Sequence, residues 1–325
     1  MKAIVYREYG PPDVLKLEEV KKPAPAEKEV LIRVRAAAMN PLDWHFMRGL
    51  PYLVRLMTGL VKPKDIRFGV DVAGEVEAVG DGVQELQVGA AVFGTCRGAF
   101  AEYVCAAESA VVRKPENLSY EEAAAVPIAG LTALQCLRDK GLVQAGQKVL
   151  VNGAAGGVGT FGVQIAKAFG AEVTGVCSTR NVEMVRSIGA DHVVDYTRED
   201  FTKSGVKYDV ILDCVTNHSL AEYKRCMTVE GRHVGAGRLD GGGRWMIGAL
   251  ASSLAASAHL LVGKQKFLSI FAKANQKDLL TLHGLLQSGK IRPVIDRQFR
   301  LSEVPEAIRY LEQLHARGKV VIAIE

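Results

Sequence analysis

Runs of one charge are absent from this chain of 325 residues, in which 41 Lys and Arg face 36 Asp and Glu and leave a formal net charge of +5. The basic residues are scattered, and none forms a patch interleaved with aromatic side chains. Such a distribution does not indicate nucleic-acid binding. We therefore expect no nucleic-acid partner, and a few local basic sites for an anionic ligand account for the small positive excess.

The chain also lacks C-x-x-C pairs and an apolar leader. Its cysteines are widely and irregularly spaced, which is typical of free thiols in a reducing compartment. The first residues read as a strand, so no secretory signal is expected. These features predict a cytoplasmic protein. The six cysteines are Cys96, Cys105, Cys136, Cys177, Cys214 and Cys226.

Long apolar runs are scarce, and only residues 245–262 need a separate judgement. This segment is rich in Ala, Leu and Ser, but it contains His259 and is shorter than the roughly 20 residues of a membrane span. We interpret it as one or two buried or interface helices, with a peripheral membrane contact as the alternative. No integral membrane span is expected.

The sequence falls into two regions with different secondary-structure patterns. Residues 1 to about 110 are rich in β-branched runs punctuated by glycine and proline, which predicts a β-rich domain. Ser119 is a plausible helix N-cap, and we expect Pro127 and Gly130 to interrupt the alanine run that follows it. Strands and helices then alternate, as in the βαβ units of a parallel sheet. The predicted strands lie at 148–152, 172–177, 192–195, 208–214 and 233–236, the helices at 158–169 and 182–188, and a last strand at 319–322.

The strongest local signal is the glycine-rich turn between the strand at 148–152 and the helix at 158–169. Ala154, Gly156 and Gly159 occupy the three small-residue positions of a G-x-G-x-x-G-like fingerprint. Small residues there permit a tight turn, a close approach of the backbone to a pyrophosphate, and close packing of helix on strand. The helix N-terminus adds free N–H groups that favour phosphate. The predicted cofactor-binding residues of this turn are Ala154, Ala155, Gly156, Gly157, Val158 and Gly159.

The end of the next strand indicates which dinucleotide is bound. A site for NADH usually places Asp or Glu there, whereas this chain has Ser178, Thr179 and Arg180. Two hydroxyl donors and a guanidinium fork suit a 2′-phosphate, so the sequence predicts NADPH. A solvated surface position at a helix start is the alternative for Arg180.

Several segments together resemble the medium-chain dehydrogenases/reductases of the quinone oxidoreductase type, over essentially the whole chain. The similar segments are residues 1–3 (MKA), 37–43 (AAMNPLD), 69–74 (GVDVAG), 126–133 (VPIAGLTA), the glycine turn and 317–321 (RGKVV). The resemblance implies an α/β fold with a Rossmann-type doubly wound parallel sheet and a β-rich GroES-like catalytic domain, and it implies a homodimer. The expected domains are 1–120 (GroES-like, N-terminal part), 121–262 (Rossmann, NADPH-binding) and 263–325 (returning to the catalytic domain).

The catalytic zinc of the alcohol-dehydrogenase branch of this family has no equivalent set of ligands here. Where that branch has a Cys and a His-Glu pair, this chain has Asn40, Val70 and Asp71. A catalytic zinc site needs three protein ligands, with nitrogen and sulfur donors favoured. We therefore expect no metal. Without a Lewis acid, the accessible chemistry is hydride addition to a carbon that is already electrophilic, as in a quinone or an α,β-unsaturated carbonyl.

The resemblance also suggests individual roles. Asn40 is expected to orient the substrate or the nicotinamide ribose, although a structural turn residue before Pro41 is as good an interpretation. Thr132 resembles the residue beside the nicotinamide, with a helix-terminal hydroxyl as the alternative. Tyr52 is expected to donate to a developing oxyanion or to line the pocket. Tyr196, Arg317 and Lys319 resemble residues near the cofactor, with surface solvation as the alternative for the last two.

The leading hypothesis is thus a zinc-independent NADPH-dependent oxidoreductase that acts on a small quinone or enone. A NADPH-binding protein with an interaction or regulatory role is one alternative. A zinc alcohol dehydrogenase with displaced ligands is another.

Overall fold

The computed structural model describes residues 1–236 and 264–325, which form two compact units. The first unit comprises Met1–Leu131, Ala274–Ser288 and Pro293–Glu325, and the second comprises Thr132–Lys273 and Gly289–Arg292. The first unit is therefore built from both ends of the chain, with the second inserted into it. The first boundary along the chain falls between Leu131 and Thr132, and the domain limits expected from the sequence stay predictions.

The apolar stretch at 245–262 lies outside the described residues. Within the part of the chain that is described, no helix is long and apolar enough to cross a bilayer.

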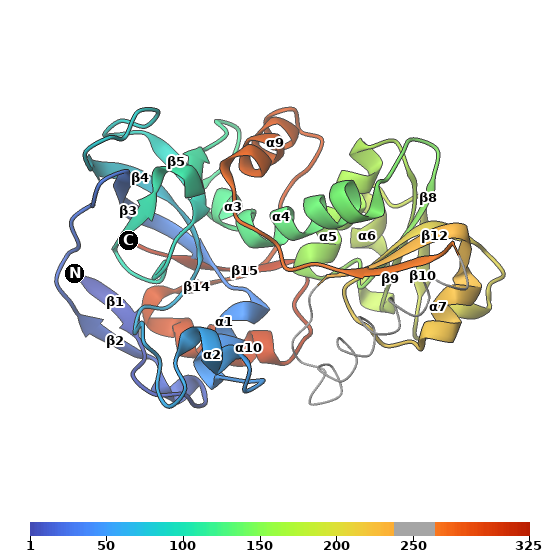
Figure 1. Ribbon diagram of the computed structural model, residues 1–325, viewed down its shortest axis with the longest axis horizontal. Helices are drawn as coiled ribbons and strands as arrows, with labels where there is room; N and C mark the ends of the chain where they lie inside the picture. The colour runs from blue at the N-terminus through green and yellow to red at the C-terminus, as the bar shows by residue number, and fades with distance from the viewer. Residues whose placement is uncertain (237–263) are drawn as a thin grey trace. The chain divides into compact units, whose positions relative to one another are not determined.

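The first unit is organised around a β-sheet in the order β14-β15-β3-β4-β5-β7, with β6 pairing the other half of β3. Its middle strand, β3, alternates buried and more exposed positions at its centre and is fully buried at its end. The strand β15 pairs antiparallel with β3, so strands from before and after the second unit share one sheet, as the red and blue strands of Figure 1 show. The strands are β3 (Glu29–Ala38), β4 (Asp71–Val79), β5 (Ala91–Thr95), β6 (Tyr103–Ala107), β7 (Val111–Arg113), β14 (Ile295–Arg300) and β15 (Lys319–Ala323), and a separate pair is formed by β1 (Lys2–Val5) and β2 (Lys16–Glu19).

Side chains of this sheet and of the helix α10 form the core of the first unit, with Ile32, Phe100 and Ile322 among its members. α10 buries the positions spaced three and four apart and has Pro305 in its first turn, where no intrahelical N–H is needed. The helices of this unit are α1 (Pro41–Arg48), α2 (Val54–Thr58), α3 (Tyr120–Ala124), α9 (Gln276–Gln287) and α10 (Val304–Glu312).

The second unit contains a six-stranded parallel sheet in the order β10-β9-β8-β11-β12-β13. The order reverses beside β8, which is the topological switch point where ligands bind in doubly wound folds. The strands are β8 (Lys148–Asn152), β9 (Glu172–Cys177), β10 (His192–Asp195), β11 (Tyr208–Asp213), β12 (Met227–Gly235) and β13 (Lys266–Ser269), and the helices include α5 (Gly157–Ala168), α6 (Val182–Ser187), α7 (Leu220–Cys226) and the π-helical turn η3 (Cys136–Gly141).

One helix prediction was wrong in an informative way. Ser119 caps α3 by accepting from the Glu122 N–H, as expected, and Pro127 begins the next helix, α4 (Pro127–Gln135). Gly130, however, lies inside α4 and does not end it. A Cβ at Gly130 would lie 3.1 Å from Leu282 Cδ1, so this glycine lets α9 pack closely against α4.

The glycine-rich turn has the expected strand–turn–helix form, but the sharp bend is made one residue earlier than predicted. Gly153 has φ 84°, in the region that favours glycine, whereas Ala154 is fully buried. Gly156 is the N-cap residue of α5. A Cβ at Gly159 would lie 2.0 Å from the carbonyl oxygen of Gly153, so Gly159 sets how closely α5 approaches β8.

We expect the substitutions Gly159→Ala and Gly284→Ala to change stability in opposite directions. The methyl group at 159 would collide with backbone, which costs about 1–3 kcal/mol or more. Gly284 lies in α9 with open space where the methyl group of an alanine would lie, so alanine there should stabilise the helix by about 0.5–1 kcal/mol. Urea unfolding of both variants measures the two changes, and a neutral Gly159→Ala would contradict the close approach.

Candidate active site

The predicted phosphate-binding elements gather at the carboxyl edge of the parallel sheet. α5 begins at Gly157 directly after β8, and its first turn has N–H groups without intrahelical acceptors. Ser178 and Arg180 follow β9, the neighbouring strand. Tyr196 follows β10, and its backbone N–H donates to the carbonyl of Cys177 over 3.0 Å. The structure thus brings the turn, the β9 end and Tyr196 to the ends of three adjacent strands.

This corner also has unused hydrogen-bonding capacity. Asn181 Nδ2 donates to Ser178 Oγ over 3.1 Å. The other end of the same carboxamide, Asn181 Oδ1, is buried and has no partner among the residues described. A buried polar atom without a partner is costly, so its presence fits a site that a polar ligand completes.

An acid that the sequence analysis missed stands at the same edge. Asp195 ends β10, and its carboxylate accepts from the Thr179 hydroxyl over 2.6 Å and from the Thr197 hydroxyl over 2.8 Å. The Thr179 hydroxyl is therefore already used as a donor. Its hydrogen bond holds the pKa of Asp195 below the usual range, and the Arg198 guanidinium lies 3.6 Å away. The sequence could have indicated Asp195, because the ends of adjacent parallel strands lie side by side.

A second cluster of polar residues connects the carboxyl ends of β8, β11 and β12. Asp213 accepts at Oδ1 from Asn152 Nδ2, and its Oδ2 lies 2.9 Å from His233 Nε2. Burial raises the pKa of Asp213, but its hydrogen bonds, first that of His233, outweigh burial and lower the pKa to about 2. The backbone N–H groups of Val215 and Thr216 also donate to Asp213, so this carboxylate fixes the start of the loop after β11.

In the first unit, the predicted catalytic residue Asn40 belongs to a buried ionic cluster. Lys319 Nζ donates to Asn40 Oδ1 over 2.6 Å and to Asp71 Oδ2 over 3.2 Å, and Asn40 Nδ2 donates to Asp71 Oδ2 over 2.9 Å. Asn40 and Lys319 are each 3% exposed, and Asp71 is fully buried. Both ends of the Asn40 carboxamide are thus engaged. Lys319 is not the surface residue offered as one alternative, and its expected cofactor contact stays a prediction.

The cluster lies where the sheet meets two helix starts. Asn40 caps α1, Asp71 begins β4, and Lys319 begins β15. The second oxygen of Asp71 accepts from the Ile128 N–H, in the first turn of α4. Burial raises the pKa of the Asp71 carboxyl, and the Lys319 ammonium opposes that rise.

Asp43, in the first turn of α1, is a further buried acid beside this cluster. Its Oδ2 accepts from the backbone N–H of Asn40 over 2.7 Å. Burial raises the pKa of Asp43 from 3.8 to about 7, although the Asn40 N–H acts in the opposite direction. Asp43 therefore titrates close to neutral pH.

The remaining predicted residues differ in their exposure. Tyr52 is 71% exposed and has the Arg55 guanidinium 4.9 Å from its ring centre. Thr132 is buried in α4, in the second unit. Arg317 is an exposed residue of the first unit whose backbone N–H donates to Asp296. Among the described residues, no group of three or more His, Cys, Asp or Glu side chains is arranged to hold a metal ion.

Comparison with known proteins identifies two family models along the chain. Residues 26–116 match the alcohol dehydrogenase GroES-like domain, and residues 188–322 match a family described as zinc-binding dehydrogenase. The GroES-like match falls on the β-rich first unit, and the other match covers much of the parallel sheet and the C-terminal strands.

Similar proteins cover almost the whole chain. The chain is 37% identical to the 2-methylene-furan-3-one reductase of Solanum lycopersicum, over 99% of this chain and 79% of that protein. It is 32% identical to the chloroplast envelope quinone oxidoreductase homolog of Arabidopsis thaliana, over 99% and 98%. Among solved structures, the quinone oxidoreductase from Coxiella burnetii superposes with a TM-score of 0.86 at 31% identity, over 100% of this chain and 99% of that one.

The buried ion pair gives a stability prediction. Lys319→Met leaves the Asp71 carboxylate buried without its cation, which should lower the free energy of unfolding by about 3–5 kcal/mol. Lys22→Met is the control, because the Lys22–Glu77 pair is exposed and such pairs contribute about 0–1 kcal/mol. Adding Asp71→Asn to Lys319→Met should recover part of the loss. Urea unfolding measures all three, and a loss as small as that of Lys22→Met would contradict the role assigned to Lys319.

Asp43 gives a pH prediction. Between its ordinary pKa of 3.8 and its folded pKa of about 7, the unfolded chain has lost a proton that the folded protein keeps. The contribution of Asp43 to the free energy of unfolding therefore falls as pH rises through this window, by at most about 4 kcal/mol, and is constant above it. The difference in unfolding free energy between wild type and Asp43→Asn, measured across the window, should show this slope. A difference that does not vary with pH would refute it.

Proposed function

Since the chain belongs to the medium-chain dehydrogenases/reductases of the quinone oxidoreductase type, we propose that it is a zinc-independent, NADPH-dependent reductase of quinones or α,β-unsaturated carbonyls. The proposal that no zinc is needed rests on one observation. The ammonium of Lys319 is held between Asn40 and Asp71.

Those two residues stand where the alcohol-dehydrogenase branch has two of its zinc ligands. In this chain their oxygens already bind a cation that is built into the protein. A divalent ion at the same place would be repelled by the ammonium, and Asn40 offers neither thiolate nor imidazole. The electrophile must therefore be reactive without a metal, which favours a carbon conjugated with a carbonyl.

The cofactor is proposed to bind along the carboxyl edge of the parallel sheet. NADPH supplies a hydride to the substrate when it is bound. The first turn of α5 would hold the pyrophosphate, and Ser178, Arg180 and Tyr196 would surround the 2′-phosphate. The hydrogen bonds of Thr179 and Thr197 to Asp195 stabilise its ionised form, so the cation of Arg180 has to outweigh the repulsion between this carboxylate and a phosphate.

The residues predicted to act near the reacting atoms are proposed to orient the substrate and the cofactor rather than to exchange protons. The Lys319–Asp71 pair fixes the carboxamide of Asn40 at the start of α1, so the position of this helix is set before substrate binds. Tyr52 and Thr132 are proposed as donors near the nicotinamide and the developing oxyanion, and Arg317 as a cofactor contact.

We further propose a homodimer in the cytoplasm. The dimer is what the family resemblance implies, and gel filtration with light scattering measures it directly. The six cysteines are all unpaired in the structure, which fits a reducing compartment.

Turnover with NADPH and a panel of quinones and enones, followed by loss of nicotinamide absorbance, tests the activity. We expect oxidation of NADPH with at least one class of acceptor, unchanged after dialysis against a chelator, and protein without stoichiometric zinc. Tight NADPH binding without turnover would favour a regulatory role, and loss of activity on chelation would favour a zinc enzyme. Either result would overturn the proposal.

Cofactor choice is tested by Arg180→Ala in the same assay. Loss of charge-assisted bonds to the 2′-phosphate should raise KM for NADPH by about tenfold to a hundredfold while leaving KM for NADH nearly unchanged. Arg198→Ala is the matched control, because Arg198 lies at the same edge beside Asp195. An equal effect of Arg180→Ala on both cofactors would contradict the assignment.

A further inference from the structure

A cavity of about 920 Å³ lies in the second unit, at the amino ends of β11 and β12 and beside β13. The proposed cofactor position is at the carboxyl ends of the same sheet, so the two places lie toward opposite ends of the strands. A volume of this size is typical of a site for a small molecule. Nothing in the proposed reaction uses it.

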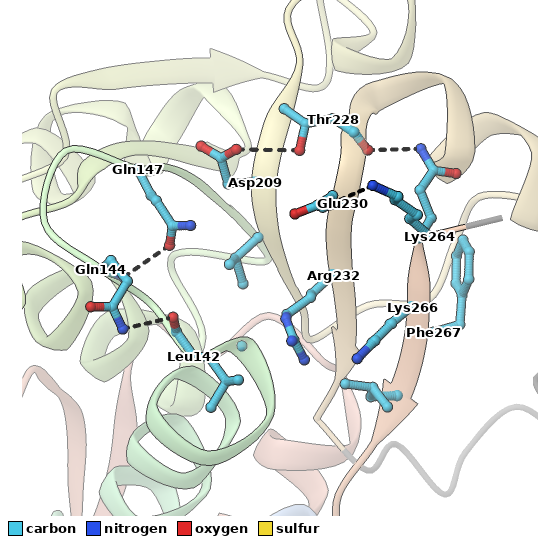
Figure 2. Close-up of a pocket in the computed structure, with 14 residues that line it drawn as sticks. Leu142, Gln144, Gln147, Asp209, Thr228, Glu230, Arg232, Lys264, Lys266 and Phe267 are labelled. Atoms are coloured by element: carbon cyan, nitrogen blue, oxygen red, sulfur yellow. Dashed lines mark hydrogen bonds and ion pairs between the residues drawn. The ribbon is translucent and has the colours of Figure 1, made fainter. Parts of the chain in front are cut away.

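Two cations face this cavity from neighbouring strands. Arg232 of β12 and Lys266 of β13 are directly paired in the parallel register, which places both side chains on the same face of the sheet. Figure 2 shows them side by side, directed into the same space. Like charges directly opposite each other across two strands are destabilising. An anion between them would convert this repulsion into attraction.

The other charges of the cavity do not neutralise this pair. Glu230 is bound to Lys264 at 3.0 Å. Asp209 accepts from the Lys148 backbone N–H and from the Thr228 hydroxyl. Neither Arg232 nor Lys266 forms an ion pair with a carboxylate in the described ranges 1–236 and 264–325.

The guanidinium of Arg232 is anchored yet retains free donors. Its Nη1 donates to the carbonyl oxygen of Lys140 over 3.2 Å, at the end of η3. An arginine has five N–H donors, so one bond to a carbonyl fixes its direction and leaves others for a ligand.

The pairing of β11 with β12 is irregular beside the cavity, because the register of the two strands shifts between Tyr208 and Val210. Thr228 and Glu230, in the part of β12 where the register shifts, line the cavity.

The lining of the cavity also has apolar side chains. Leu142 follows η3 with φ 52°, a conformation that is uncommon for a side chain of this kind, and it is 46% exposed. Leu268 lies two residues after Lys266 on β13, and so on the same face of the sheet. An exposed leucine at the rim of a cationic cavity is explained if it covers the apolar part of a ligand.

From this arrangement we infer that the cavity is a binding site for a small organic phosphate, with the phosphate between Arg232 and Lys266 and its apolar part against Leu142 and Leu268. A dianionic phosphate matches two cations, and the guanidinium fork matches its oxygens. The inference does not depend on the proposed reductase activity.

Calorimetric titration of the full chain, saturated with NADPH, with phenyl phosphate tests this site. NADPH keeps the probe from the proposed cofactor position, and phenol and potassium chloride at equal ionic strength control for the ring and for screening. We expect saturable binding of phenyl phosphate with one site per chain, weaker binding of inorganic phosphate, and none of phenol. Failure of phenyl phosphate to bind saturably would overturn the inference.

Variants locate the binding. Arg232→Met and Lys266→Met should each raise Kd by about tenfold or more, since each removes a charge-assisted contact. Lys277→Met, which removes one exposed positive charge from the first unit, should leave Kd unchanged. Without ligand, Lys266→Met should unfold at the same or a higher temperature than wild type, because a repulsion is removed, and this readout distinguishes lost binding from lost fold.

If the protein fails to bind NADPH, the titration is made without it and includes Arg180→Ala. Loss of phenyl phosphate binding in Arg180→Ala, with Arg232→Met unaffected, would assign the phosphate to the other edge of the sheet and overturn the inference. Loss in Arg232→Met alone would support it even though the proposed cofactor had failed.

Discussion

The ammonium of Lys319 is the constraint on which the first unit depends. It joins the C-terminal strand to the start of β4 through Asp71 and to the start of α1 through Asn40, and Asp71 continues the connection to the first turn of α4. Removing a lysine and an aspartate from water is costly, and only complete pairing and hydrogen bonding make the arrangement tolerable. Its value is geometric, because one charge fixes the positions of segments that are distant in the sequence.

The same interaction supports the proposal that the site works without a metal. A metal ion fixes its ligands and also polarises the substrate, whereas the buried ammonium of Lys319, bonded to Asn40 and Asp71, fixes its partners. Hydride transfer to a conjugated carbonyl requires alignment and donors for the oxyanion more than it requires a Lewis acid. The cluster therefore suits a reductase whose substrate is activated by its own conjugation.

Much of the fold was predictable, because its signals are local. The strand at 148–152, the glycine turn and the helix after it were placed correctly from spacing and residue size, and Ser119 was placed correctly from its capping chemistry. Gly130 was misplaced because the reason for a glycine there is Leu282, a neighbour from a distant part of the sequence. The bend at Gly153 was assigned one residue late, because the fingerprint specifies small residues but not which of them has positive φ.

The candidate site was predictable only in part, because its contacts join residues from distant parts of the sequence. Motifs indicated Asn40, Asp71 and Lys319 separately, but their contact depends on β15 returning to pair with β3. Asp195 was missed although its strand was predicted, because its importance comes from the strand beside it. The topology of a sheet determines which strands lie side by side. The spacing of residues within one segment does not specify that topology.

The insertion of one unit within the other bears on the order in which the protein acquires its structure during translation. The inserted parallel sheet needs only residues close together in the chain, so most of it can form before β15 is synthesised. The first unit cannot close at that stage, since β15 and the charge that balances Asp71 follow the inserted unit in the chain. A ribosome-bound chain stopped before Lys319 should thus carry a formed nucleotide-binding unit beside an open, incompletely paired β-domain.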